Sequence, residues 1–157
     1  MTAPSRPIIR PHTVEDHAGI VEAWTAASRI ATPFLSDGFV AAERERIPTV
    51  WLPVAETWVA DHEGAVAGFI SLIGHEVGGL FVHPDHQGRG IGRALMDHAV
   101  RLRGSLFLDV FEDNAIGRRF YDRYGFRFDH EHVHEETGRN QLRLTYEPGE
   151  ESGEATA

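Results

Sequence analysis

Apolar residues recur every three to four positions in four segments of the chain, which predicts four helices. They are expected over residues 14–29, from 37 to about 47, from 91 to about 103 and from 115 to 124. Thr13 with Asp16 resembles a capping box before the first helix, and Ser36 and Asn114 suit the N-caps of the second and fourth. Pro48 and Pro53 are expected to bracket the end of the second helix.

Alternating or continuous apolar runs predict the strands. The expected strands cover residues 8–10, 56–61, 65–74, 77–82, 106–111, 126–134 and 142–146. A tight turn with a positive φ at Gly64 should join the second strand to the third. This order predicts one mixed α/β domain over residues 1–147, with a largely antiparallel first half. The acidic segment 148–157 is expected to be a disordered tail.

The amino-acid composition excludes several kinds of catalytic and binding site. The chain has 157 residues and no cysteine, and its 15 basic residues are all arginine. Disulfides, cysteine-bound zinc, a cysteine acyl-enzyme and a Schiff-base lysine are therefore excluded. A formal net charge of −9 argues against nucleic acid as a partner. Without a long apolar run or a signal-peptide pattern, we expect a cytoplasmic protein that does not bind a membrane.

A glycine-rich loop between a strand and a helix is the most informative segment. It reads Gln87-Gly-Arg-Gly-Ile-Gly-Arg93. Glycines allow close backbone approach, and the start of a helix attracts anions. The loop therefore predicts a pyrophosphate cradle, to which Arg89 and Arg93 add charge. A nucleotide-binding P-loop would need a lysine, and the dinucleotide fingerprint fails because Arg93 or Leu95 stands where its last glycine belongs.

Two motifs resemble those of a known family. Gln87-Gly-Arg-Gly-Ile-Gly92 is similar to the Gln/Arg-x-x-Gly-x-Gly/Ala signature of the GNAT N-acetyltransferases. Asn114-Ala-Ile-Gly-Arg-Arg-Phe-Tyr121, followed by Gly125-Phe126, is similar to that family's second conserved segment. Both come in the family's order with a strand between them, and the chain looks closest to small bacterial members of unassigned substrate.

The resemblance implies the α/β GNAT fold, in which helices flank a mixed, mostly antiparallel central sheet. It also implies an acetyl-CoA-dependent N-acetyltransferase, for which no metal is expected. The amine of a small molecule or peptide would attack the thioester directly in a ternary complex. A non-catalytic module that binds or senses acyl-CoA is the alternative, and Tyr121 argues for the enzyme because a pure binder needs no acid there. Relatives are often homodimers, but the sequence shows no diagnostic surface.

The resemblance also assigns roles to residues. Pantetheine would pair with the strand at Leu80, Phe81 and Val82, and Asn114 would contact the CoA arm. Tyr121 would touch the cofactor and protonate the departing thiolate as general acid. The pyrophosphate would be bound by the residues of the loop: Gln87, Gly88, Arg89, Gly90, Ile91, Gly92 and Arg93.

The sequence offers more than one candidate for the general base and for the acceptor pocket. Glu76 is the first candidate base because some protein-acetylating relatives have a glutamate at that spacing, and His75 is the second. Neighbours on a strand point to opposite faces, so at most one of the two faces the cleft. Water is the third candidate, because many relatives have no single obvious base. Trp24, Phe34 and Leu35 either line an acceptor pocket or belong to the core.

Histidines outside the motifs also suggest two readings. His130, His132 and His134 alternate, so they should share one strand face, as three possible metal ligands or as an exposed polar surface. The exposed surface is the prediction that we adopt, so no metal is expected. His83 is expected to shape the turn before Pro84.

Overall fold

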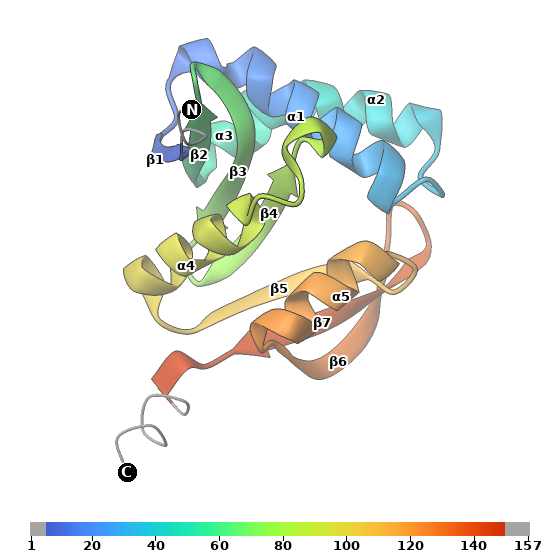
Figure 1. The fold of residues 1–157 in the computed structure, drawn as a ribbon. Coiled ribbons are helices and arrows are strands. Elements are labelled where there is room, and N and C mark those ends of the chain that lie inside the picture. The colour runs from blue at the N-terminus through green and yellow to red at the C-terminus, as the bar shows by residue number, and fades with distance from the viewer. Residues whose placement is uncertain (1–5, 150–157) are drawn as a thin grey trace.

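The computed structural model describes residues 6–149 as a seven-stranded sheet covered by helices on both faces (Figure 1). The strand order is β1-β2-β3-β4-β5-β7-β6, and β4 with β5 forms its one parallel pair. The strands are β1 (Ile8–Pro11), β2 (Glu56–His62), β3 (Ala65–Ile73), β4 (Glu76–Val82), β5 (Leu106–Phe111), β6 (Arg127–His134) and β7 (Arg139–Tyr146). The predicted mixed α/β, mostly antiparallel architecture is confirmed.

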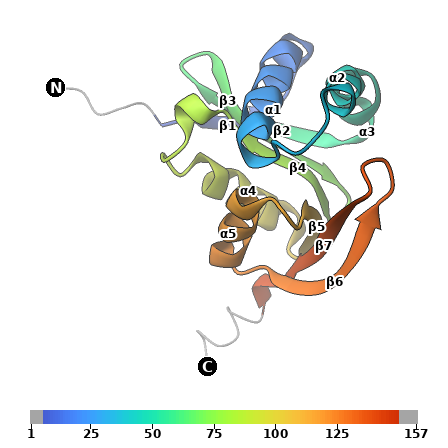
Figure 2. The same ribbon diagram turned by 90° about the vertical axis from the view of Figure 1, so that its right-hand side faces the viewer.

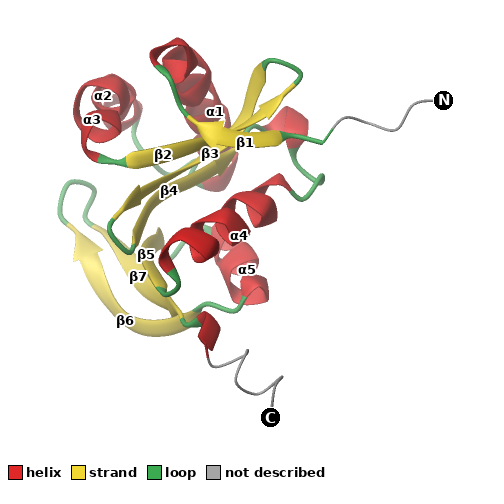
Figure 3. Cartoon of the chain, turned by 90° about the vertical axis from the view of Figure 1, so that its left-hand side faces the viewer, coloured by secondary structure: helices red, strands yellow, loops and turns green. Residues whose placement is uncertain are grey.

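The helices form two layers, one on each side of the sheet. Together, α1 (His17–Ala31), α2 (Asp37–Arg46) and α3 (Leu52–Val54) lie on one side, and α4 (Ile91–Arg103) and α5 (Ala115–Tyr124) lie on the other (Figures 2 and 3). Short 3-10 turns, Val14–Asp16 and Pro84–His86, precede α1 and α4.

Two apolar clusters hold these layers to the sheet. The larger one joins α4 to strands on both sides of the β4–β5 boundary and includes Ile70, Leu95 and Leu108, which are almost fully buried. The smaller one packs α1 on β2 and β3 through Ile20 and Val59, which have no exposed surface. Burying a side chain of this size stabilises the fold by about 1.5–3 kcal/mol. The core thus spans the sheet even where β4 and β5 separate.

The predicted helix starts are confirmed by their hydrogen bonds. The Phe39 N–H donates to Ser36 Oγ at 3.1 Å, and the Gly117 N–H donates to Asn114 Oδ1 at 2.8 Å. The Asp16 carboxylate accepts from the Thr13 N–H at 2.8 Å, so the expected box stands before a 3-10 turn rather than before α1 itself.

The end of the second helix differs from the prediction. α2 stops at Arg46, two residues before Pro48, but the chain continues as a π-helical segment over Ile47–Trp51 and then as α3. Pro48 and Pro53 occupy early positions of these two short segments. The residues before each proline are already helical, so each proline removes an N–H that a regular helix would use, and the change from α- to π-helical turns falls beside Pro48.

The three alternating histidines lie on β6 and use different partners. His130 bonds Asp129, His132 Nε2 lies 3.0 Å from Asp109 Oδ1, and His134 bonds Thr137. Within residues 6–149 no three His, Asp or Glu side chains are arranged to hold a metal ion.

No helix in the described part of the chain is long and apolar enough to cross a bilayer. The segment predicted to be a disordered tail lies mostly beyond residue 149 and so falls outside the described residues.

Candidate active site

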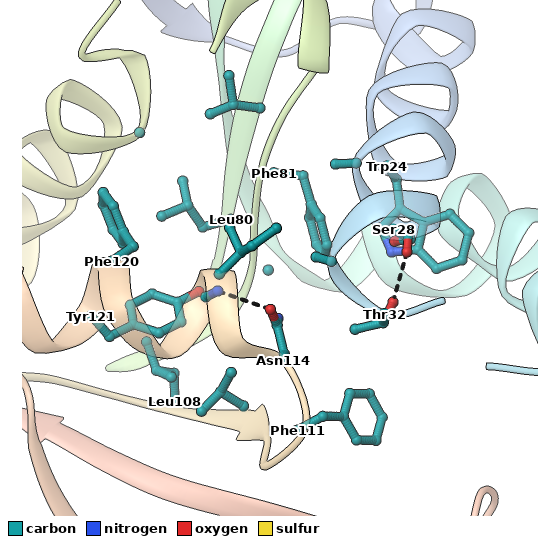
Figure 4. Close-up of a pocket in the computed structure, with 18 of the residues that line it drawn as sticks. Trp24, Ser28, Thr32, Leu80, Phe81, Leu108, Phe111, Asn114, Phe120 and Tyr121 are labelled. Atoms are coloured by element: carbon teal, nitrogen blue, oxygen red, sulfur yellow. Dashed lines mark hydrogen bonds between the residues drawn. The ribbon is translucent and has the colours of Figure 1, made fainter. Parts of the chain in front are cut away.

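A cavity of about 770 Å³ lies where β4 and β5 diverge (Figure 4). The two strands pair at Glu76 and Phe107, where the Phe107 N–H donates to the His75 carbonyl at 3.0 Å. Beyond that point, within the described chain, the β5-facing edge of β4 has no backbone partner up to Val82. An extended ligand can therefore hydrogen-bond to this edge as an added strand would.

The cavity reaches both helical layers. Figure 4 shows Phe120 and Tyr121 of α5 on one side of β4, and Trp24 and Ser28 of α1 on the other. Leu80 and Phe81 of β4 stand between them, and all these residues line the cavity. Two substrates can thus enter from opposite faces and meet between the strands.

The glycine-rich loop forms the end of the cavity beside α4. Gly88 and Gly90 have φ values of 82° and 77°, and Gly90 is the N-cap of α4. In the described structure, no protein acceptor takes a hydrogen bond from the backbone N–H groups of residues 88–93. These free N–H groups at a helix N-terminus fit a pyrophosphate.

Side chains of the loop fix its position against β4 and add positive charge. Gln87 Nε2 donates to the Val82 carbonyl at 3.1 Å, which ties the loop back to β4. Arg93 lies over the Tyr124 ring at 5.5 Å from its centroid, and Arg89 is exposed. The predicted loop residues line the cavity except Arg89, whose side chain faces solvent at its rim.

Asn114 combines two features in one side chain. Its Oδ1 caps α5, and the residue also lines the cavity. A Cβ at Gly117 would lie 2.7 Å from Asn114 Nδ2, so the glycine makes room for this amide. With Oδ1 committed to the cap, Nδ2 is the group left to donate to a ligand.

Tyr121 and Tyr124 lie one helical turn apart but differ in what their hydroxyls do. Tyr124 donates to Asp97 Oδ1 at 2.6 Å, whereas the Tyr121 hydroxyl has no hydrogen-bond partner in the described chain. Tyr121 lines the cavity, and burial raises its pKa to about 12. It therefore stays protonated at neutral pH and is free to donate to a bound ligand.

The opposite end of the cavity is built from the N-terminal helices and the ends of the C-terminal strands. Trp24 and Ser28 of α1 and its C-cap residue Thr32 follow one another at four-residue spacing, and all three are buried. The Thr32 hydroxyl donates to the Ser28 carbonyl at 3.0 Å (Figure 4). The other residues that line this end are Phe39 and Glu43 of α2, Phe111 of β5, His134 of β6 and Gln141 of β7.

Two carboxylates line the cavity, and both are paired. Glu43 accepts hydrogen bonds from Arg46 at 2.8 Å and from Trp51 at 3.3 Å. Arg143 donates to the two Asp109 oxygens, from Nε at 2.7 Å and from Nη2 at 3.1 Å. Burial alone would raise the pKa of Asp109, but its hydrogen bonds from Arg143 and His132 outweigh burial and lower it. Asp109 is thus a stable anion and a poor base.

The residues proposed for the base from sequence lie apart from the cavity. Glu76 begins β4 and does not line it. His75 is exposed in the turn before β4, and its Nδ1 contacts the Ser105 carbonyl at 2.8 Å. His83, expected to shape a turn, accepts from the Asp85 N–H at 3.1 Å.

The three residues proposed for the acceptor pocket take different positions, and Leu35 lines the cavity. Trp24 lines the cavity and packs edge-on against Phe81. Phe34 does not line it, but it lies edge-on to Phe111 with ring centroids 5.6 Å apart. The Arg139 guanidinium covers the other side of Phe34 at 4.4 Å. Phe34 therefore supports a cavity wall from behind.

Sequence reasoning missed several lining residues. Ser28 and Thr32 had a signal, because they are polar residues on the same face of α1 as Trp24. Glu43, His134 and Gln141 had none, since they come from three elements far apart in the chain and match no local motif.

Comparison with known proteins agrees with this geometry. The family model of the acetyltransferase (GNAT) domain matches residues 53–128. Peptidyl-lysine N-acetyltransferase YjaB of Salmonella typhimurium is 35% identical over 121 residues, which cover 76% of this chain and 82% of that protein. Peptidyl-lysine N-acetyltransferase YiaC of Escherichia coli is 31% identical over 123 residues, with 76% and 82% covered.

The fold has a close counterpart among solved structures. The solution structure of apo YjaB from Escherichia coli matches with a TM-score of 0.82 and 29% identity, covering 90% of this chain and 98% of that one. The matching family model, the curated relatives and the shared fold lead to one conclusion: this chain belongs to the GNAT family of acetyltransferases.

Proposed function

We propose that this chain transfers the acetyl group of acetyl-CoA to the side-chain amine of a lysine in a peptide or protein. The observation that carries the proposal is a cavity that runs from an anion-binding loop, past a free tyrosine hydroxyl, to a second end lined by Trp24 and Glu43. The relatives named as peptidyl-lysine N-acetyltransferases support lysine as the acceptor, because the chain covers most of their length.

Each part of the cavity has a role in this reaction. The N–H groups of residues 88–93 bind the pyrophosphate, and the free edge of β4 at Leu80–Val82 pairs with pantetheine. Asn114 Nδ2 donates to the same arm, and the Tyr121 hydroxyl donates its proton to the sulfur that leaves. The protein needs no nucleophile of its own, because it holds the amine and the thioester together.

A lysine side chain fits the opposite end of the cavity. Trp24 and Phe111 offer apolar surface to its methylene groups, and the Glu43 carboxylate attracts its ammonium. An acyl-CoA-binding module without turnover is the alternative. The Tyr121 hydroxyl favours the enzyme, because it lines the cavity as a donor without a protein partner, and a module without turnover needs no acid there.

The test pairs a binding experiment with a turnover assay. Purified protein is titrated calorimetrically with acetyl-CoA, CoA, ATP and NAD, and then assayed on a lysine peptide with acetyl-CoA. We expect selective micromolar acetyl-CoA binding and acetylation of the peptide. The enzyme has no lysine, so acetyl-lysine detected in the assay comes from the acceptor alone. Binding without acetylation of any amine in a panel would support the module instead.

Gly90 provides a matched pair of variants that tests the pyrophosphate site. Its φ of 77° is tolerated by Asn or Asp better than by other side chains, and no atom lies within 4 Å of a Cβ built there. Gly90→Asp places a negative charge before the phosphates and should weaken acetyl-CoA binding by about 100-fold or more. Gly90→Asn has the same shape without the charge and should stay within about fivefold. Equal affinities for the two variants would move the pyrophosphate site elsewhere.

A further inference from the structure

His134 is the single histidine that lines the cavity in the described structure, and it lies at the acceptor end. It is the last residue of β6, and Arg139 of β7 is its partner in register. An amine acceptor enters as an ammonium ion, and it must lose a proton before it attacks a carbonyl. Imidazole is the side chain best suited to take that proton near neutral pH.

The His134 ring is held in a fixed orientation. Its Nδ1 lies 2.9 Å from Thr137 Oγ1, which also accepts from the Arg139 N–H at 3.3 Å. The ring meets Phe111 edge-on at 5.4 Å between centroids and Phe39 edge-on at 5.9 Å. With Nδ1 bound to Thr137, Nε2 is the nitrogen left for an acceptor.

Glu43 stands close to the same end. It follows Phe39 by four residues on α2, so both side chains project from one face of the helix toward the cavity. Its carboxyl side chain is 17% exposed. Arg46 bridges Glu43 and Glu136, so these three side chains together keep one negative charge. An ammonium drawn to this group therefore approaches the Phe39–His134 contact.

The other charged groups near His134 are engaged elsewhere. Arg139 lies over Phe34 and bonds Asp113 at 3.2 Å, and Glu136 of the β6–β7 turn bonds Arg46 at 2.9 Å. On β5, Asp109 is held by Arg143 and His132. Glu135 follows His134 and is exposed. These contacts leave His134 as the one cavity-lining side chain with a free basic nitrogen.

We propose that His134 is the general base of the reaction and that Glu43 guides the ammonium toward it. His134 Nε2 takes one proton from the ammonium, and the neutral amine attacks the thioester carbon. The C–N bond forms and the C–S bond breaks, and the thiolate takes its proton from Tyr121. The attacking nitrogen then loses its second proton, which restores Tyr121 through water, and His134 releases the first to solvent.

The inference rests on the proposed function, and the test separates the two. His134→Gln is compared with wild type on two acceptor peptides, one with lysine and one with an aminooxy group in place of the ammonium. The aminooxy group is already unprotonated at neutral pH and needs no base. We expect kcat/KM on the lysine peptide to fall about 100-fold and kcat/KM on the aminooxy peptide to fall less than about threefold.

Controls exclude a structural effect. His132→Gln changes the neighbouring histidine on the same face of β6, outside the cavity lining, and should leave both rates within about threefold. His134→Asn keeps a donor near Thr137 and provides a second variant if His134→Gln folds poorly. Both His134 variants should bind acetyl-CoA as the wild type does.

Each outcome decides one of the two proposals. Equal losses on both peptides, or no loss on the lysine peptide, would overturn the role of His134. If the wild-type enzyme does not acetylate the lysine peptide, the proposal that lysine is the acceptor is wrong. The His134 comparison would then use the amine that the panel identifies, with its aminooxy counterpart.

Discussion

At the scale of single residues, the structure distinguishes two neighbouring tyrosines by the state of their hydroxyls. Tyr121→Phe removes a free donor in the cavity, and we expect kcat to fall about 100-fold while acetyl-CoA affinity stays within about threefold. Steady-state kinetics and calorimetry check both values. Tyr124→Phe is the matched control, because it removes a hydroxyl bonded to Asp97 outside the reaction path.

The same pair shows what would contradict the assignment. A Tyr121→Phe enzyme with unchanged kcat would remove Tyr121 as the acid. A loss of acetyl-CoA affinity equal to the loss of kcat would make Tyr121 a binding residue. Because the pKa of Tyr121 is about 12, deprotonation of this hydroxyl should not lower the wild-type rate below about pH 10.

Single residues also show how far the sequence could predict the site. Tyr121, Asn114 and the loop glycines lie in short local motifs, so their positions followed from spacing along the chain. His134 and Glu43 reach the cavity through the long-range pairing of β6 with β7 and the packing of α2. A side chain of that kind leaves no periodic signal, which is why sequence reasoning placed the base at Glu76 or His75.

At the scale of elements, α4 carries a histidine whose burial couples stability to pH. His98 packs against Trp58 of β2 with ring centroids 4.2 Å apart, and its Nε2 is buried without a partner in the described structure. Burial and the nearby Arg101 lower the pKa of His98 below its usual value of 6.5. Folding therefore favours the neutral imidazole.

The sign of the pH effect follows from that lowered pKa. Below pH 6.5 the unfolded chain takes up a proton that folded His98 resists, so the contribution is full above this pH and declines below it. His98→Phe should reduce the loss of unfolding free energy between about pH 7.5 and about pH 5.5, measured by urea denaturation. His130→Gln, an exposed control, should not. An unchanged loss in His98→Phe would assign the effect to other groups, with His86 first.

The segment after α2 shows where sequence patterns are not sufficient to predict the secondary structure. Periodicity located every strand of the described chain and the four longer helices. The signal is clearest where an element buries one regular apolar face, as α4 and β5 do. It did not show that the chain stays helical from Ile47 to Val54. Prolines usually end helices, and here Ile47 and Leu52 are buried against α1 and β2, so tertiary packing favours helical turns that local preference disfavours.

At the scale of the whole molecule, one sheet is divided at the β4–β5 boundary while one core continues across it. The larger cluster joins residues of β3 and β4 to residues of β5 and β7. The strands can therefore separate without dividing the protein into two halves. The resulting gap leaves backbone groups of β4 and of the loop without protein partners, and these are the groups expected to bind acetyl-CoA.

This division makes a prediction for amide hydrogen exchange. Without ligand, the amides of residues 88–93 and the unpaired amides of Val77–Val82 should exchange quickly, since no protein acceptor protects them. Saturating acetyl-CoA should slow them about tenfold or more, as measured by exchange mass spectrometry. The β6–β7 hairpin, already paired along its length, serves as the internal reference and should change less. Uniform slowing of both regions would indicate only global stabilisation by a bound ligand. A second, smaller pocket lies between α5 and β6 and is lined by Arg118, Asp122 and Phe128, among others. Slowing confined to that pocket would place the ligand there instead.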